Sequence, residues 1–249
     1  MSMLAGRVAI VTGSARNIGR ATALRLAHEG AAVMVHARSD ADGAAETVAL
    51  LDAAGVTAAS HLADLSTEDG ANGLVTATVS KLGRLDILVN NAAVRRNTPI
   101  TEISLAEWRE VLGASLDAAF LTTRAAAPHM MAGKWGRIVN LGGISMFSGL
   151  AGRAHVSAAK AGMVGMTRSL ATELGPHGIT VNVVAPGAIA TVRGAAAGAR
   201  PSGSLSASLP AGRDGRPEEI AHIVAMLCSP DAAYTTGQTI EVNGGRHYS

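Results

Sequence analysis

Seven short segments of this chain are apolar along their whole length, and longer stretches with helical spacing separate them. A strand with apolar side chains on both faces needs cover on both faces, which a parallel sheet between two layers of helices provides. The pattern therefore predicts an α/β fold with a doubly wound, seven-stranded parallel sheet. The predicted strands are Val8–Thr12, Ala32–His36, Val56–Leu62, Leu85–Asn90, Arg137–Leu141, Thr180–Ala185 and Thr239–Val242.

The composition fits one domain and argues against several classes of function. A chain of 249 residues with 48% hydrophobic residues can bury one sizeable core, so we expect a single domain over residues 1–249. Aromatic residues make up only 2% and the net charge is +2, which argues against a nucleic-acid partner. Apolar runs are too short for a membrane span, and we expect no metal site. The lone Cys228 and the absence of a leader pattern favour a cytoplasmic protein.

One segment, residues 193–215, departs from the alternating pattern. It is rich in Gly, Ala, Ser and Pro, a composition typical of loops. It follows the sixth predicted strand, at the carboxyl edge of the sheet where such folds bind their ligands. The segment could be a substrate lid or an ordinary surface loop.

The first predicted strand leads directly into a glycine-rich turn, TGSARNIGRA, which opens a predicted helix. Such a turn directs backbone N–H groups and the positive end of the helix at a pyrophosphate, as in dinucleotide-binding domains of the Rossmann fold. Asn17 takes the place of a middle glycine, and asparagine tolerates the left-handed backbone that the turn needs. Gly13 and Gly19 could also form a tight turn that binds no ligand.

Three further motifs accompany this turn: NNAA at 90–93, PGAIAT at 186–191 and VNGG at 242–245. In this order and spacing, the four motifs resemble the short-chain dehydrogenase/reductase family over nearly the whole chain. The resemblance implies a nicotinamide dinucleotide cofactor and a small-molecule substrate. The cofactor-binding residues that it implies are Gly13, Ser14, Asn17, Ile18 and Gly19 at the phosphates, Asp64 and Leu65 at the adenine, Asn91, Ala92 and Ala93 beside the adenosine, and Pro186, Gly187, Ile189 and Thr191 in the motif near the nicotinamide.

Two of these residues have alternative interpretations: Asp64 could cap the helix that opens near Ser66, and Thr191 could cap a helix in the 193–215 segment. The family resemblance also implies a homotetramer, or else a homodimer, built on the helices around 104–131 and 150–174.

The end of the second predicted strand determines the choice between the two nicotinamide cofactors. An acidic residue there binds the free ribose of NAD, whereas a cation receives the 2′-phosphate of NADP. Here Arg38 and Ser39 follow the strand, and Arg16 supplies a second guanidinium from the glycine-rich turn. The sequence therefore predicts NADP. Alternatively, Arg38 is solvated and Asp40 or Asp42 serves NAD.

Members of the family use a Tyr to exchange the proton, and a Lys one helical turn later lowers the pKa of that Tyr and holds the ribose. A Ser polarises the carbonyl, and an Asn supports a chain of water molecules. The matching positions in this chain hold Val156, Lys160, Gly143 and Ser115, so only the lysine is retained. Both tyrosines of the chain lie near its C-terminus, and no shift in register restores the motif.

Four side chains near the missing tyrosine could take part in catalysis. Lys160 could hold the ribose without a Tyr to tune, and His155 has a suitable intrinsic pKa but points about 100° away from position 156 on a helix. Arg153 could bind an anionic substrate or polarise a carbonyl, and Ser145 could replace the missing hydroxyl. Alternatively, His155 could be a packing or surface histidine. Arg153 could be an exposed surface residue, and Ser145 could cap a helix or loop.

Three functions fit these observations. The first is an NADP-dependent oxidoreductase that reduces a carbonyl or imine with an unusual proton source. The second is a cofactor-binding partner subunit without hydride chemistry, and the third is an enzyme that uses the dinucleotide pocket for non-redox work. The intact PGAIAT motif favours the first, and the three altered positions favour the second.

Overall fold

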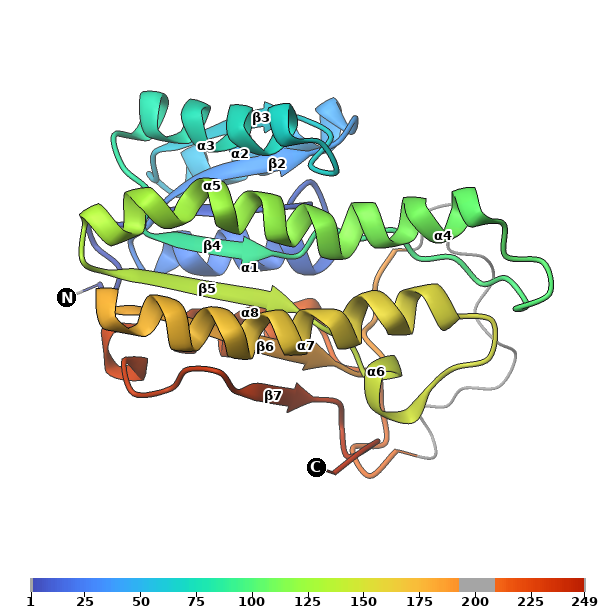
Figure 1. The fold of residues 1–249 in the computed structure, drawn as a ribbon. Coiled ribbons are helices and arrows are strands. Elements are labelled where there is room, and N and C mark those ends of the chain that lie inside the picture. The colour runs from blue at the N-terminus through green and yellow to red at the C-terminus, as the bar shows by residue number, and fades with distance from the viewer. Residues whose placement is uncertain (1, 193–208, 249) are drawn as a thin grey trace.

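The sheet predicted from the sequence is confirmed. The computed structural model describes residues 2–192 and 209–248, and its seven strands are all parallel in the order β3-β2-β1-β4-β5-β6-β7 (Figure 1). Each strand lies within two residues of its predicted ends. The strands are β1 (Val8–Val11), β2 (Ala32–Ala37), β3 (Ala58–Leu62), β4 (Ile87–Asn90), β5 (Gly136–Leu141), β6 (Ile179–Pro186) and β7 (Thr239–Val242).

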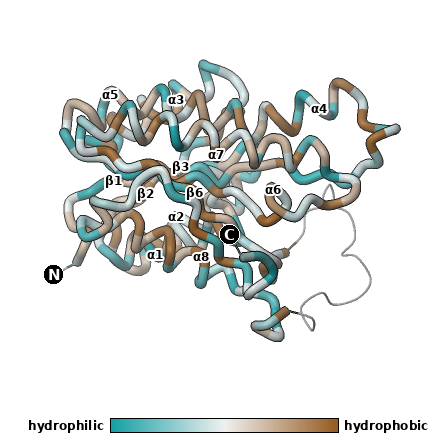
Figure 2. The backbone as a smooth tube through the Cα atoms, turned by 60° about the horizontal axis from the view of Figure 1, so that its bottom comes forward, coloured by the Kyte–Doolittle hydropathy of each residue, from teal (hydrophilic) through white to brown (hydrophobic). Residues whose placement is uncertain are grey.

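Helices cover both faces of this sheet. One layer contains α1 (Asn17–His28), α2 (Ala41–Ala53) and α8 (Pro217–Cys228). The other contains α3 (Glu68–Leu82), α4 (Leu105–Leu112), α5 (Ala118–Ala132) and α7 (Ala154–Leu174). Figure 2 shows α1, α2 and α8 on one side of the strands and α3 and α5 on the opposite side. The short helix α6 (Ser145–Ser148) lies at the carboxyl edge, and within the described part of the chain no helix is long and apolar enough to cross a membrane.

Alternation along the strands explains why their segments are apolar throughout. Ala9 and Val11 of β1 belong to the core beneath α1 and α8, whereas Ile10 between them belongs to the core beneath α3, α5 and α7. Successive strand side chains point to opposite faces, so a strand covered on both sides buries every residue.

The order of the strands creates a crevice at one edge of the sheet. β1 pairs with β2 on one side and with β4 on the other, because the chain crosses back over the sheet after β3. In open α/β sheets, ligands bind at the carboxyl ends of the strands where the order reverses in this way. The fold therefore places the candidate site between the ends of β1 and β4.

Part of the segment predicted as a lid or loop, residues 193–208, lies outside the described residues. After it, the chain returns to the sheet edge, where Gly215 forms an isolated parallel bridge with Ile189.

A buried polar network joins the two central strands to the helices that cover them. Asn90 donates to Asn140 over 2.8 Å, and Asn140 in turn donates to Thr167 of α7 over 2.8 Å. Thr122 of α5 donates to Asn90 over 2.8 Å. A satisfied buried network of this kind fixes the relative positions of its elements, and a missing member leaves its partners unpaired.

We expect Asn140→Ala to lower the free energy of unfolding by about 2–4 kcal/mol, because it removes the shortest hydrogen bond of the buried Asn90 amide and the bond to the buried Thr167 hydroxyl, and leaves a cavity. Urea unfolding followed by circular dichroism measures the change. Thr172→Ala is the matched control. It removes an exposed hydroxyl of α7, which donates to the carbonyl of Arg168 over 3.1 Å, and should change the free energy of unfolding by less than about 0.5 kcal/mol. Equal effects of the two substitutions would contradict the role given to the network.

Candidate dinucleotide and substrate site

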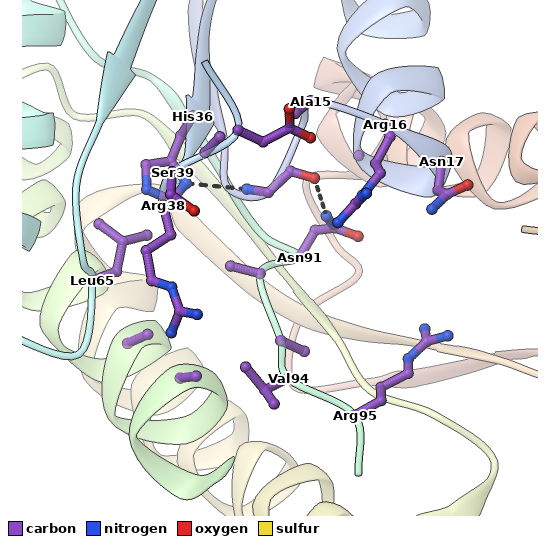
Figure 3. Close-up of a pocket in the computed structure, with 18 of the residues that line it drawn as sticks. Ala15, Arg16, Asn17, His36, Arg38, Ser39, Leu65, Asn91, Val94 and Arg95 are labelled. Carbon is purple, nitrogen blue, oxygen red and sulfur yellow. Dashed lines mark hydrogen bonds between the residues drawn. The ribbon is translucent and has the colours of Figure 1, made fainter. Parts of the chain in front are cut away.

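A cavity of about 420 Å³ occupies the predicted crevice (Figure 3). It runs from the ends of β2 and β3 past the glycine-rich turn to the segments that follow β4 and β6. Most of the residues predicted to bind the cofactor meet at this cavity. Those that line it are Gly13, Arg16, Asn17, Ile18, Gly19, Arg38, Ser39, Asp64, Leu65, Asn91, Ala92, Ala93 and Thr191.

The glycine-rich turn is shaped to bring backbone close to a ligand. Gly13 has a φ of 64°, and a Cβ at Gly19 would collide with the carbonyl oxygen of Gly13. The Asn91 amide donates to the carbonyl of Thr12 over 2.8 Å and to that of Gly13 over 3.1 Å, which fixes the turn against the end of β4. The first N–H groups of α1 therefore open onto the cavity, where they and the helix dipole favour an anion.

Asn17 joins this turn to the far side of the cavity. Its φ of 53° confirms the left-handed backbone expected at this position. Its side-chain amide donates to the carbonyl of Val192 over 2.9 Å, and its carbonyl oxygen accepts from the N–H of Val192 over 2.9 Å. The two hydrogen bonds form a clasp between the start of α1 and the segment after β6.

His36 fixes the same turn from below, a role that the sequence analysis missed. Its Nδ1 accepts from the N–H of Gly13 over 3.1 Å, so the neutral ring carries its proton on Nε2 and donates to Ala63 over 3.0 Å. Burial lowers the pKa of His36 from 6.5 to about 4, which keeps the ring neutral at physiological pH. The sequence signal for this role was that His36 is a polar residue within an otherwise apolar strand.

Ser14 contributes to the shape of the turn and does not line the cavity. Its hydroxyl is fully buried, donates to Val11 over 2.7 Å and accepts from the N–H of His36 over 3.0 Å. Pro186, Gly187 and Ile189 also lie outside the lining. A Cβ at Gly187 would approach Asn243 within 2.6 Å, so that glycine permits close packing of β6 against the VNGG segment.

At the adenosine end, β2 stops at Ala37, and exposed Arg38 and Ser39 follow it into the cavity. Asp40, the alternative ligand for a free ribose, caps α2 by accepting from the N–H of Gly43 over 3.1 Å.

Asp64 both lines the cavity and shapes its own turn. It accepts hydrogen bonds from the hydroxyl and the N–H of Ser66 at 2.7 and 3.0 Å, and these bonds lower the pKa of its carboxyl. The following helix, α3, begins at Glu68 and is capped by Thr67, whose hydroxyl accepts from the N–H of Gly70 over 3.1 Å, so Asp64 shapes the turn before the helix and does not cap it.

Lys160 is buried against the end of β5 and lies outside the cavity lining. The ammonium of Lys160 donates to the carbonyl of Leu141, at the end of β5, over 2.5 Å. Burial, and then the charge of Arg95, lowers the pKa of Lys160 to about 7. Val156 lies one helical turn earlier and is also buried. A Cβ at Gly143 would meet nothing within 4 Å, so this position has room for a side chain.

The other candidate catalytic residues are spread around this end. His155 is fully buried and lies outside the cavity lining, with its Nε2 3.0 Å from Glu107 of α4. Ser145 is buried at the start of α6 and also lies outside the lining, whereas Arg153 lines the cavity. Ser115 lies in a π-helical turn, Gly113–Asp117, between α4 and α5.

Arg95 is a lining residue that the sequence analysis did not single out. It lies beyond NNAA in the segment after β4, and Figure 3 shows it at the end of the cavity opposite Arg38. Its position two residues after the motif was the only signal available.

Comparison with known proteins agrees with this geometry. A family model described as Enoyl-(Acyl carrier protein) reductase matches residues 13–247. A 3-oxoacyl-[acyl-carrier-protein] reductase from Synechocystis is 40% identical over 246 residues, 98% of each chain. A subunit of (2S)-[(R)-hydroxy(phenyl)methyl]succinyl-CoA dehydrogenase from Thauera aromatica is 41% identical over 96% of each chain. The chain belongs to the short-chain dehydrogenase/reductase family.

A solved structure extends the likeness to the fold. A protein described as a short-chain alcohol dehydrogenase from Sinorhizobium meliloti superposes with a TM-score of 0.92 at 36% identity, covering 97% of this chain and 96% of that one. The fold of this chain, including its seven-stranded sheet, therefore matches that of a solved member of the short-chain dehydrogenase/reductase family.

We expect the stability of the protein to depend on pH through His36. The unfolded ring takes up a proton as the pH falls through 6.5, whereas the folded ring resists protonation until about pH 4. The free energy of unfolding should therefore drop by about 3 kcal/mol between these pH values on account of this group.

The variant His36→Asn tests this, because its side-chain oxygen can accept from Gly13 but cannot titrate. Urea unfolding at several pH values should show that wild type loses about 3 kcal/mol more than the variant between pH 7 and pH 4. Parallel stability curves for the two proteins would show that His36 is not the group responsible.

Proposed function

We propose that this protein is an NADP-dependent oxidoreductase that reduces a carbonyl or imine group of a small molecule with an atypical proton source. The observation that carries the proposal is the cavity at the switch point, which combines a phosphate-binding turn with Arg16 and Arg38 and has no acidic residue at the end of β2. The names of the relatives, which include reductases and dehydrogenases, support the reaction class.

The residues of the cavity fit the proposed cofactor. Asn17, Ile18 and Gly19 line the cavity at the start of α1, where the first N–H groups of the helix would bind a pyrophosphate. Arg38 and Arg16 would receive the 2′-phosphate, and Thr191 lies on the far side of the cavity, after β6. The cofactor, when bound, supplies a hydride at nicotinamide C4.

Lys160 is the proposed proton donor. Reduction of a carbonyl needs a proton on oxygen as the hydride reaches carbon, and Val156 has none to give. A buried lysine whose pKa is about 7 holds a proton at neutral pH and can release it, as tyrosine does elsewhere. The ammonium donates to the carbonyl of Leu141, two residues before Gly143 in the sequence.

The second candidate is a partner subunit that binds the cofactor without transferring hydride. The altered positions Ser115, Gly143 and Val156 favour it, and the Thauera relative is itself named as a subunit. Non-redox use of the pocket is the third candidate. A homotetramer, or else a homodimer, in the cytoplasm remains a prediction.

NADPH should bind at least tenfold more tightly than NADH, because Arg38 and Arg16 interact with the 2′-phosphate. In fluorescence titrations, Arg38→Gln should weaken NADPH binding about 10- to 100-fold and leave NADH binding within about twofold. NADH thus serves as the internal control. Tighter binding of NADH than of NADPH by the wild type would overturn the choice of cofactor.

Reduction should fall off with rising pH through about 7, because only the protonated form of Lys160 can donate. Stopped-flow measurement of NADPH oxidation with a panel of ketones and imines between pH 5.5 and 9 would show the decline. Lys160→Arg keeps a cation that cannot give up its proton in this range, so its rate should be about 10²–10⁴-fold lower and independent of pH.

Two outcomes would contradict the assignment of Lys160. Turnover by Lys160→Met at the wild-type rate would exclude this lysine as the donor. Tight NADPH binding without turnover of any compound in the panel would favour the partner-subunit candidate.

A further inference from the structure

A single carboxylate, that of Glu107 in α4, joins two segments that line the cavity. One oxygen of this carboxylate, Oε1, lies 2.6 Å from the hydroxyl of Thr98, which donates to it, and 3.0 Å from Nε2 of His155. Thr98 belongs to the segment after β4, and His155 lies in the first turn of α7. Figure 1 shows α4 and the start of α7 beyond the carboxyl ends of the strands.

Both segments supply walls of the cavity. Val94 and Arg95 line it from the segment after β4, and Arg153 lines it from the position just before α7. The two walls also meet through their backbones, because the N–H of Thr98 donates to the carbonyl of Gly152 over 2.8 Å. The carboxylate that joins the walls lies outside the lining, so it affects the cavity through the segments that it holds.

The connection to α7 is costly to break. The His155 ring is fully buried, and its Nδ1 has no hydrogen-bond partner among the described residues. A carboxylate only accepts hydrogen bonds, so Nε2 carries a proton and donates to Glu107. Without this carboxylate both ring nitrogens would be buried and unpaired, which lowers stability. A movement of the start of α7 that brings the ring to water would relieve this cost.

The segment after β4 is held at two neighbouring positions of α4. The hydrogen bond from Thr98 lowers the pKa of the Glu107 carboxyl, and the bond from His155 adds to this effect, so the group is ionised at neutral pH. Hydrogen bonds to an ionised acceptor are roughly twice as strong as neutral ones. One turn later, Glu110 forms a two-bond ion pair with Arg96 at 2.7 and 2.9 Å. Of these two carboxylates, Glu107 also holds the start of α7.

We propose that Glu107 is a positioning residue that fixes the distance between these two walls and so limits the size of the substrate that the cavity accepts. The proposal rests on the proposed function, because it concerns the substrate of the same site. A displacement of about 1 Å in a group that contacts the substrate can change a reaction rate about 100-fold. A carboxylate outside the cavity can therefore determine which compounds fit.

Binding of methyl ketones of increasing length, from acetone to methyl hexyl ketone, tests the proposal. Ligand-observed NMR titration of the protein loaded with NADP⁺, which cannot reduce the ketones, gives each dissociation constant without turnover. Glu107→Ala should shift the ratio of the constants for the longest and shortest ketones at least about fivefold in favour of the longest, because the walls can then separate. Glu107→Gln keeps an oxygen that can accept from both partners, so its ratio should stay within about twofold of the wild-type ratio.

Two further variants assign the effect to the hydrogen bonds. Thr98→Val removes the hydroxyl but keeps the shape of the side chain and the backbone bond to Gly152, so the ratio should shift in the same direction and by less. Glu102→Ala removes an exposed carboxylate shortly before α4 and should leave the ratio unchanged. The affinity for NADP⁺ should stay within about twofold of wild type in every variant, because the phosphate-binding turn lies on other elements.

Amide hydrogen exchange shows whether the walls move. In Glu107→Ala, exchange should become faster over residues 94–98 and 152–156 and stay unchanged over residues 13–20 of the glycine-rich turn. Melting curves show whether each variant is folded, and Thr98→Val decides the test if Glu107→Ala is not.

The outcomes separate this proposal from the proposed function. An unchanged ratio in Glu107→Ala, or a shifted ratio that Glu107→Gln does not restore, would overturn the positioning role and leave the proposed function intact. Weaker binding of all ketones and of NADP⁺ by one common factor would show that Glu107 only stabilises the fold, which would also overturn it. A wild type that binds none of the ketones would refute both proposals. A size preference that depends on Glu107, in a protein that reduces no ketone or imine with NADPH, would support the positioning role and refute the proposed function.

Discussion

Burial of the sheet on both faces is the constraint on which the rest of the molecule depends. Strand residues such as Ala9 and Ile10 enter two separate apolar cores, so both faces of the sheet are covered and an open ligand site forms at an edge. The reversal of strand order between β1 and β4 then opens one crevice at the carboxyl edge. The glycine-rich turn, the adenosine end and the segment after β4 meet there because the strands deliver them to one place.

Within the crevice, charge is arranged along its length. Arg38 lies at one end, Arg95 lies at the other, and Arg16 and Arg153 also line the cavity. If the protein reduces a carbonyl as proposed, the valine at position 156 requires that another group supply the proton. Burial lowers the pKa of Lys160 to about 7, which makes this lysine the proposed proton donor.

Local patterns predicted the strands and the dinucleotide end of the site, because hydropathy and glycine spacing act within a few residues. Gly13 and Gly19 were found in this way, whereas Asn91 was implied by the family resemblance. His36 was missed as a ligand of the turn, because its bond to Gly13 joins positions far apart in sequence. The backbone hydrogen bond between Thr98 and Gly152, which joins the segment after β4 to the loop before α7, is likewise encoded by no local pattern. The direction of His155 away from position 156 was predictable from helical geometry, but its partner Glu107 was not.

The clasp between Asn17 and Val192 links parts of the site that a glycine at position 17 would leave separate. It holds the segment after β6 against the glycine-rich turn, with two hydrogen bonds that act in parallel. One side chain thereby connects two segments that lie 175 positions apart in the sequence, so a change at position 17 alters the support of both at once.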